Sequence, residues 1–179
     1  MSKMTAMDAA VSILYDEGVR HIFGIPGAGI LPFYQSMQKH GKIKHMIARH
    51  EEGAIHMADG YARAINTVGV CAATSGPGAS NFVTGLYTAQ VDSIPILAIT
   101  GQNVRAQLGR EAFQAVDIAE ICKTITKKIL PGYVLVQMKM DESSWSIVRN
   151  TPGVTGFVGS GNTPTALSDK EADEILKQM

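Results

Sequence analysis

The chain has 179 residues, of which 45% are hydrophobic, enough for one ordinary core or for one domain plus part of another. Its formal net charge is zero, with 12 basic and 10 acidic residues up to Lys128 and 4 and 6 after it. Neither part has the charge excess of proteins that bind nucleic acid or anionic membranes, so neither partner is expected. Because no apolar stretch approaches the roughly 20 residues that span a bilayer, and no signal-peptide pattern opens the chain, we expect a cytoplasmic protein.

The first two thirds of the chain alternate between helical and strand patterns. From Thr5 to Glu17 apolar residues recur at steps of three and four, which predicts an amphipathic helix that ends at Gly18. Short apolar strands separated by helices indicate a parallel sheet covered on both faces, which is an α/β fold. The predicted strands are His21–Gly24, His45–Ala48, Val68–Ala73 and Pro95–Thr100, and the later helices are Ile30–Met37, Glu51–Ala64 and Ala79–Val91.

The pattern changes after Lys128, where the α/β repeat stops. An α+β arrangement with antiparallel strands is predicted from there to the last residue. We therefore expect two parts, residues 1–128 and 129–179. The predicted elements of the second part are strand Tyr133–Met140, helix Asp141–Val148, strand Val154–Val158, loop Ser160–Pro164 and a helix Asp169–Lys177 that opens with the capping box Ser168–Glu171.

The two cysteines, Cys71 and Cys122, do not have the spacing of a metal site, and Cys71 lies within an apolar run. Buried free thiols are the expected state of both. We predict no metal site in this sequence.

The stretch Ala48–Ala54 places two glutamates where a predicted strand ends and a helix begins. Open parallel sheets bind ligands at this edge. Neighbouring helix residues point about 100° apart, so Glu51 and Glu52 cannot both face one cleft. One interpretation is that both glutamates simply favour the positive end of the helix dipole. The alternative is that one is a partly buried carboxylate that exchanges a proton with a ligand nitrogen.

Three glycine-rich turns follow predicted strands, at Gly24–Gly29, Thr74–Gly78 and Thr100–Gln102. Glycine permits a ligand to approach the backbone closely. None of the turns fits the dinucleotide fingerprint or the phosphate-binding loop with its lysine, which disfavours nicotinamide and ATP. Each alone is a plain turn, but three at equivalent strand ends favour a common ligand edge.

Five motifs follow one another along the chain, at Phe23–Gly27, Arg49–Arg63, Thr74–Asn81, Ile94–Gln102 and Ala112–Asp117. Together they resemble the N-terminal domain of the acetolactate synthase and glyoxylate carboligase group, which depends on thiamine diphosphate. The similarity runs from the start of the chain to about Lys127.

The resemblance implies a role for Glu51 as the catalytic carboxylate, because the matching glutamate of that family hydrogen-bonds the pyrimidine N1′ of the cofactor. The imino tautomer that results lets the cofactor's own amino group deprotonate its thiazolium C2. Phe113 and Gln114 would line the substrate pocket. The residues implied in cofactor binding are Ile25, Pro26, Gly27, Ala28, Glu51, Thr74, Gly76, Pro77, Asn81 and Gln114.

Both members of the group, glyoxylate carboligase and acetolactate synthase, remain as interpretations. Leu31–Tyr34, Gln38–Gly41 and Phe113–Ile118 are closer to glyoxylate carboligase. That enzyme, however, has an apolar residue at the position of Glu51, whereas acetolactate synthase has the glutamate.

In both, a separate domain with a Gly-Asp-Gly motif holds the diphosphate and Mg²⁺, and this motif does not occur in the sequence. A homo-oligomer or a complementary diphosphate-binding domain is therefore an expected partner.

The second part of the chain resembles the later half of the N-terminal domain of NusG. The matching segments are Ile129–Val136, Trp145–Gly159 and Ser168–Glu171. In that family the domain packs on RNA polymerase, so the resemblance implies polymerase as a partner. Three hypotheses follow, namely part of a carboligase, a polymerase-binding module, and a chimera without a function as a unit.

Overall fold

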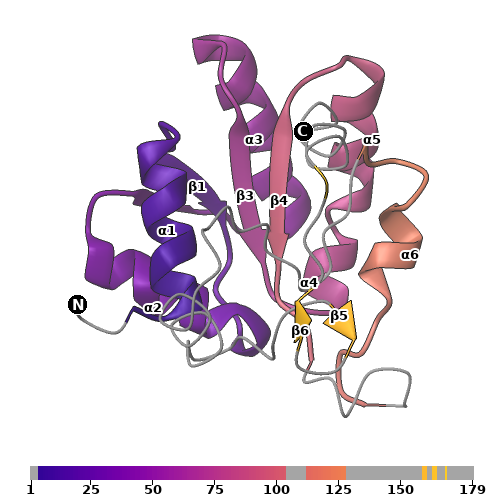
Figure 1. Ribbon diagram of the computed structural model, residues 1–179. Coiled ribbons are helices and arrows are strands. Elements are labelled where there is room, and N and C mark those ends of the chain that lie inside the picture. Colours follow the sequence, from indigo (N-terminus) through magenta and orange to yellow (C-terminus); the bar gives the residue numbers. More distant parts are fainter. Residues whose placement is uncertain (1–3, 104–111, 128–158, 161–162, 165–167, 169–179) are drawn as a thin grey trace.

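The computed structural model describes residues 4–103 and 112–127, together with 159–160, 163–164 and 168 (Figure 1). The expected elements between Tyr133 and Val158 and the expected last helix, Asp169–Lys177, lie outside the described residues. In chain order the elements are α1 (Ala6–Asp16), β1 (His21–Gly24), η1 (Ala28–Ile30), α2 (Leu31–His40), β2 (Lys44–Ile47), α3 (Glu51–Ile65), β3 (Gly69–Ala73), α4 (Pro77–Ser80), α5 (Val83–Val91), β4 (Ile96–Thr100), α6 (Ile118–Cys122), β5 (Gly159–Ser160) and β6 (Thr163–Pro164).

The first four strands form a parallel sheet in the order β2-β1-β3-β4. The prediction of a parallel α/β sheet is thus confirmed, and each of the four strands begins and ends within one residue of its expected bounds. From β1 the chain goes first to β2 on one side and then to β3 on the other. The strand order therefore reverses between β1 and β3, which is where open α/β sheets bind ligands.

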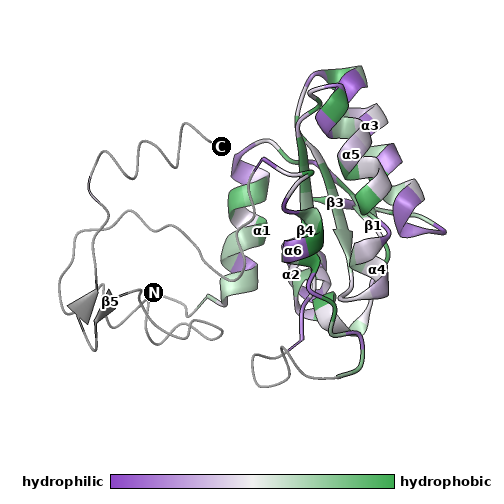
Figure 2. Ribbon diagram, turned by 90° about the vertical axis from the view of Figure 1, so that its right-hand side faces the viewer, coloured by the Kyte–Doolittle hydropathy of each residue, from purple (hydrophilic) through white to green (hydrophobic). Residues whose placement is uncertain are grey.

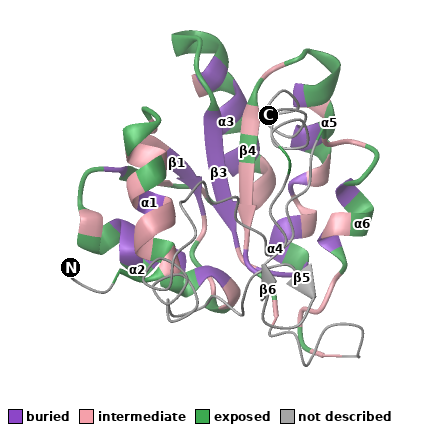
Figure 3. Cartoon of the chain, viewed as in Figure 1, coloured by how far each residue is buried: buried purple, intermediate pink, exposed green. Residues whose placement is uncertain are grey.

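Two hydrophobic cores lie on opposite faces of the sheet. Strand β3 is buried along its whole length (Figure 3), and its side chains alternate between the two cores. Val70 and Ala72 pack with α1 and α2, whereas Cys71 and Ala73 pack with α3 and α5. In Figure 2 the helices that cover the sheet carry both hydrophilic and hydrophobic residues. Both cysteines are buried, as expected, and burial raises the pKa of each thiol.

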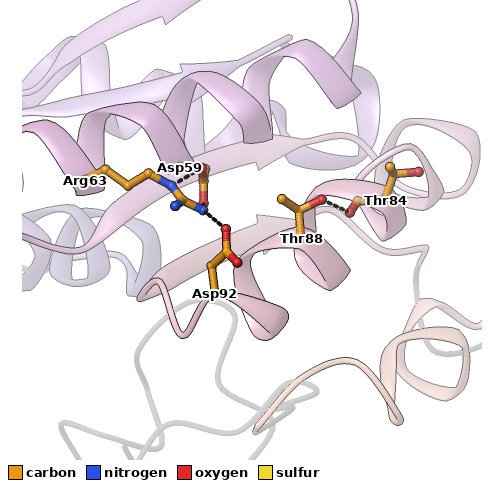
Figure 4. A network of polar contacts seen from close by, with 5 residues as sticks. All are labelled: Asp59, Arg63, Thr84, Thr88 and Asp92. Atoms are coloured by element: carbon orange, nitrogen blue, oxygen red, sulfur yellow. Dashed lines mark hydrogen bonds and ion pairs between the residues drawn. The ribbon is translucent and has the colours of Figure 1, made fainter.

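The ends of α3 and α5 are joined through Arg63, which pairs with one aspartate of each helix region. Arg63 lies between Asp59 of the same helix and Asp92 at the end of α5 (Figure 4), with nitrogen–oxygen distances of 2.7 Å to each. Hydrogen bonds to Asp59 and then Asp92 raise the pKa of Arg63. The same two helices pack closely at Gly85, where an added Cβ atom would collide with Ile55. These contacts fix the axis of α3, whose first residue is Glu51.

Two sequence predictions were wrong in detail. The helix expected over Ala79–Val91 is divided into α4 and α5 at Asn81 and Phe82. The Asn81 side chain turns to Glu51 while Phe82 is buried in the core, so tertiary contacts override the helical pattern here. The loop expected at Ser160–Pro164 contains strand residues, because β5 and β6 pair antiparallel. In the described part of the chain, no helix has the length and apolar character needed to cross a membrane.

Candidate functional site at the carboxyl edge of the sheet

The three expected binding segments leave adjacent strands at the same edge of the sheet. Ile25–Ala28 follows β1, Glu51 follows β2 after three residues, and Thr74–Gly78 follows β3. Since β1 is paired with both β2 and β3 in parallel, their carboxyl ends lie side by side. The topology therefore brings together segments whose first residues, Ile25 and Thr74, are 49 positions apart in the chain.

Glu51 is the first residue of α3 and is half-buried. The helix begins here because His50 has an extended backbone and its Nδ1 accepts a hydrogen bond from the backbone N–H of Glu52, at 3.3 Å. His50, for which the sequence suggested no role, is thus the N-cap. A carboxylate in the first turn is also favoured by the helix dipole.

One oxygen of Glu51 is held by a neighbouring amide. Asn81 Nδ2 donates to Glu51 Oε2 at 3.0 Å. The other oxygen, Oε1, accepts no hydrogen bond from the residues that the structure describes. A Cβ atom on Gly78 would stand 3.2 Å from Oε1, so glycine at this position leaves the space beside that oxygen open. The carboxylate is therefore fixed through one oxygen and available through the other.

The turns after β1 and β3 are in direct contact. Gly29 donates its backbone N–H to Thr74 Oγ1 at 3.1 Å. A Cβ atom on Gly27 would lie 2.5 Å from Thr74 Cβ, and one on Gly29 would lie 2.7 Å from Ser75 Oγ. Glycine is required at both positions for this approach, which makes one continuous surface of the two turns.

Gln114 reaches the same turn from a distant part of the chain. Ser75 Oγ donates to Gln114 Oε1 at 3.5 Å, and a Cβ atom on Gly76 would meet the Gln114 carbonyl oxygen at 2.6 Å. Gly76 and Gln114 both have positive φ, at 61° and 58°. The neighbouring Phe113 side chain is 85% exposed, and its carbonyl accepts from Asn103 Nδ2 at 2.8 Å.

The structure thus gathers most of the expected residues at one edge. Glu51, Asn81, Thr74 and Gly76 are half-buried or buried and form its polar centre, with Gln114 behind the turn. The remaining expected residues differ in exposure: Ile25 and Gly27 are half-buried, whereas Pro26, Ala28, Pro77 and Phe113 are exposed.

A separate hollow of about 570 Å³ lies at the opposite edge of the sheet. It adjoins the residues that precede β3 and β4, and Arg63 and Ser93 contribute to its lining. None of the expected cofactor or substrate residues lines it. We therefore place the candidate site at the carboxyl edge, where the polar groups converge.

Comparison with known proteins gives the family of the first part of the chain. The family model described as "Thiamine pyrophosphate enzyme, N-terminal TPP binding domain" matches residues 4–121, which is more than half of the chain. This chain belongs to that family. The cofactor of this family is thiamine pyrophosphate, also called thiamine diphosphate.

The matching relatives are much longer than this chain. A glyoxylate carboligase of Escherichia coli O157:H7 is 56% identical over 128 residues, and an acetolactate synthase of Arthrospira platensis is 52% identical over 130 residues. An acetolactate synthase large subunit of Cyanidium caldarium is 54% identical over 126 residues. These matches cover 71%, 71% and 69% of this chain but only 22% of each relative.

A second family model, "Transcription termination factor nusG", matches residues 89–176. The resemblance of the later part of the chain to NusG is thus confirmed. The match also begins 32 residues before the end of the first one, within α5. The overlap includes β4, which is a strand of the parallel sheet, and the end of α5, which packs on that sheet. The boundary at Lys128 therefore stays a proposal.

The residues at the candidate site fit the pyrimidine end of the cofactor. An aminopyrimidine presents ring nitrogens and an amino group, and Glu51 Oε1 is an acceptor that no described residue binds, beside the space that Gly78 leaves clear. Ser75, Tyr34 and His45 also lie within or beneath this edge, although the sequence analysis gave them no role. For Ser75 the signal was its place inside the second glycine-rich turn, and for Tyr34 and His45 the sequence offered none.

Proposed function

We propose that residues 1–128 are the pyrimidine-binding domain of a carboligase that acts on 2-oxo acids, with residues 129–179 as a separate NusG-like part. The observation that carries the proposal is the Glu51 carboxylate at the switch point of the sheet, which is oriented by Asn81 and whose Oε1 accepts no hydrogen bond from the described residues. Such a group can hold and return a proton at a ligand ring nitrogen. The cofactor itself supplies carbanion stabilisation at its thiazolium ring.

Around Glu51, the other expected residues would bind and orient the cofactor. Thr74 and Gly27 hold the two turns in contact, which leaves backbone close to a flat ligand ring. Asn81 fixes the direction of the carboxylate, because its amide nitrogen donates a hydrogen bond to Oε2. Phe113 and Gln114 would complete a substrate pocket together with a diphosphate-binding domain.

Two observations favour different types of carboligase. The identity of 56% favours glyoxylate carboligase, whereas the glutamate at position 51 favours acetolactate synthase. The proposal can be tested by placing residues 1–128 in both full-length relatives in place of their own domains. Carboligation of glyoxylate or of pyruvate by one hybrid would identify the type. Two folded hybrids that bind thiamine diphosphate but yield neither product would contradict the proposal.

A second candidate function, polymerase binding through residues 129–179, is favoured by the NusG match. Limited trypsin digestion tests whether these residues are a separate part. A first cut near Lys127 and Lys128, with a resistant N-terminal core, is expected if the boundary is correct. Intact resistance of all 179 residues would favour a single folded unit, and capture of purified RNA polymerase by the chain but not by residues 1–128 would support the polymerase function.

A further inference from the structure

Two backbone carbonyls at the ligand edge each accept two hydrogen bonds. The Ala72 oxygen, near the end of β3, accepts from the N–H of Ile25 at 3.3 Å and from the Tyr34 hydroxyl at 3.2 Å. The Gly24 oxygen, at the end of β1, accepts from the N–H of Ala48 at 3.2 Å and interacts with His45 Nε2 at 3.1 Å. In each case one partner is backbone and the other is an aromatic side chain.

The two aromatic side chains are also packed against each other. The rings of Tyr34 and His45 meet edge to face, with their centroids 4.8 Å apart. Tyr34 is buried, and a Cβ atom on Gly24 would lie 2.6 Å from its hydroxyl oxygen, so the glycine is what admits the hydroxyl. Burial raises the pKa of Tyr34, with smaller contributions from Cys71 and Glu51, so the hydroxyl stays protonated as a permanent donor.

The binding segments begin directly after these carbonyls. Ile25, whose N–H shares the Ala72 oxygen with Tyr34, opens the first turn, and Thr74 lies two residues beyond Ala72. Ala48, whose N–H shares the Gly24 oxygen with His45, lies three residues before Glu51. A shift of either carbonyl would therefore move the start of a segment that carries the site.

We propose that Tyr34 and His45 are positioning residues, which set the spacing of the ends of β1, β2 and β3 and thereby the place of Glu51 relative to the two glycine turns. This inference rests on the proposed function for its ligand, but the geometry that it concerns belongs to the chain itself. Buried hydroxyls also serve simply to stabilise a fold, so the test must separate positioning from stability.

The variants each remove or keep one donor. Tyr34→Phe removes only the hydroxyl, His45→Leu removes the imidazole, and His45→Gln keeps an N–H near the place of Nε2. Tyr87→Phe is the matched control, because Tyr87 is 57% exposed on α5, away from the ligand edge. All four are made in the full chain. Urea unfolding gives the global stability of each, and NMR gives the amide exchange of Ile25 and the side-chain amide signals of Asn81.

Positioning predicts local effects without ligand. In Tyr34→Phe and His45→Leu the Ile25 amide should exchange about 3- to 10-fold faster than the change in global stability accounts for, since one hydrogen bond near it is lost. The Asn81 side-chain signals should shift, and His45→Gln should restore both readouts. If exchange at Ile25 follows global unfolding in every variant and the Asn81 signals stay in place, the inference is overturned.

Ligand binding gives a second readout. The probe is 4-amino-5-hydroxymethyl-2-methylpyrimidine, the pyrimidine end of the cofactor, titrated into the chain. We expect about 3- to 10-fold weaker binding for Tyr34→Phe, rescue in His45→Gln relative to His45→Leu, and no change for Tyr87→Phe. A wild-type chain that does not bind the probe would count against the proposed function, while the Ile25 and Asn81 readouts would still decide the positioning role.

Discussion

Three neighbouring residues determine how the Glu51 carboxylate is held and how far it is accessible. His50 ends the extended segment and caps α3, Asn81 holds one carboxylate oxygen, and Gly78 keeps the space beside the other oxygen clear. Glu52 is also half-buried, but none of the described residues binds its carboxylate. Two adjacent residues of the same type are thus made different by their neighbours.

In a full-length carboligase context, Glu51→Gln should lower the rate by about two to four orders of magnitude and leave the fold intact. The amide keeps the shape of the side chain but cannot accept and return a proton. The measurement is steady-state carboligation, together with proton exchange at the C2 atom of the bound cofactor. Retained C2 exchange in the Glu51→Gln enzyme would show that Glu51 only favours the start of the helix.

Glu52→Gln is the control for this substitution. It should change the rate little and the free energy of unfolding by less than about 0.5 kcal/mol, as surface substitutions do. Equal losses of rate at the two positions would mean that the wrong carboxylate has been chosen.

Asp8 gives a prediction about acid stability. Hydrogen bonds from Lys39, at 2.8 Å, and from Ser36 lower the pKa of Asp8 from 3.8 to about 2. A lowered folded-state pKa stabilises the fold above the unfolded value, and this stabilisation is lost as the pH falls from about 4 to about 2. The difference in urea midpoint between wild type and Asp8→Asn should therefore shrink over this range. A difference in midpoint that stays constant from about pH 4 to about pH 2 would show that the pKa of Asp8 is not lowered in the folded state.

At the scale of elements, the start of α3 could be predicted because its signals are local. The end of an apolar strand, two acidic residues in the first turn and apolar residues at helical spacing all lie within Ala48–Ala64. The division between α4 and α5 could not, because it depends on Asn81 reaching Glu51, which is 30 residues away. The contacts of Tyr34 with Ala72 and of Gln114 with Gly76 are equally non-local, so no periodicity reveals them.

Substitution by alanine should have opposite effects at two glycines, one in α5 and one in α3. Gly85→Ala should destabilise the chain by about 1–2 kcal/mol, since its Cβ would collide with the fully buried Ile55. Gly60 lies in the middle of α3, where an added Cβ atom would have no described atom within 4 Å outside the adjoining helix backbone, so Gly60→Ala should stabilise the chain by about 0.5–1 kcal/mol through higher helix propensity. Urea unfolding measures both. A Gly85→Ala chain that is as stable as the wild type or more stable would mean that the packing of α3 on α5 differs from that described.

At the scale of the whole molecule, the 179-residue chain alone should have no carboligase turnover. It spans 22% of the relatives that it matches, and its sequence lacks the Gly-Asp-Gly motif that the resemblance implies for the Mg²⁺ and diphosphate site. The assay is product formation from pyruvate or glyoxylate with thiamine diphosphate and Mg²⁺. Turnover by the purified chain would contradict this expectation, and a matched relative lacking its own N-terminal domain serves as the control.

The strand order has a consequence for synthesis on the ribosome. The chain makes β1 first, then β2 on one side of it, then β3 on the other side, and then β4 beyond β3. Each new strand is therefore added to an outer edge, and none has to be inserted between two strands that already pair. Since domains begin to fold from the N-terminus during translation, the sheet can grow outward in the order in which its strands emerge. Its ligand edge is completed only when Gln114, the most distant contributor, has left the exit tunnel.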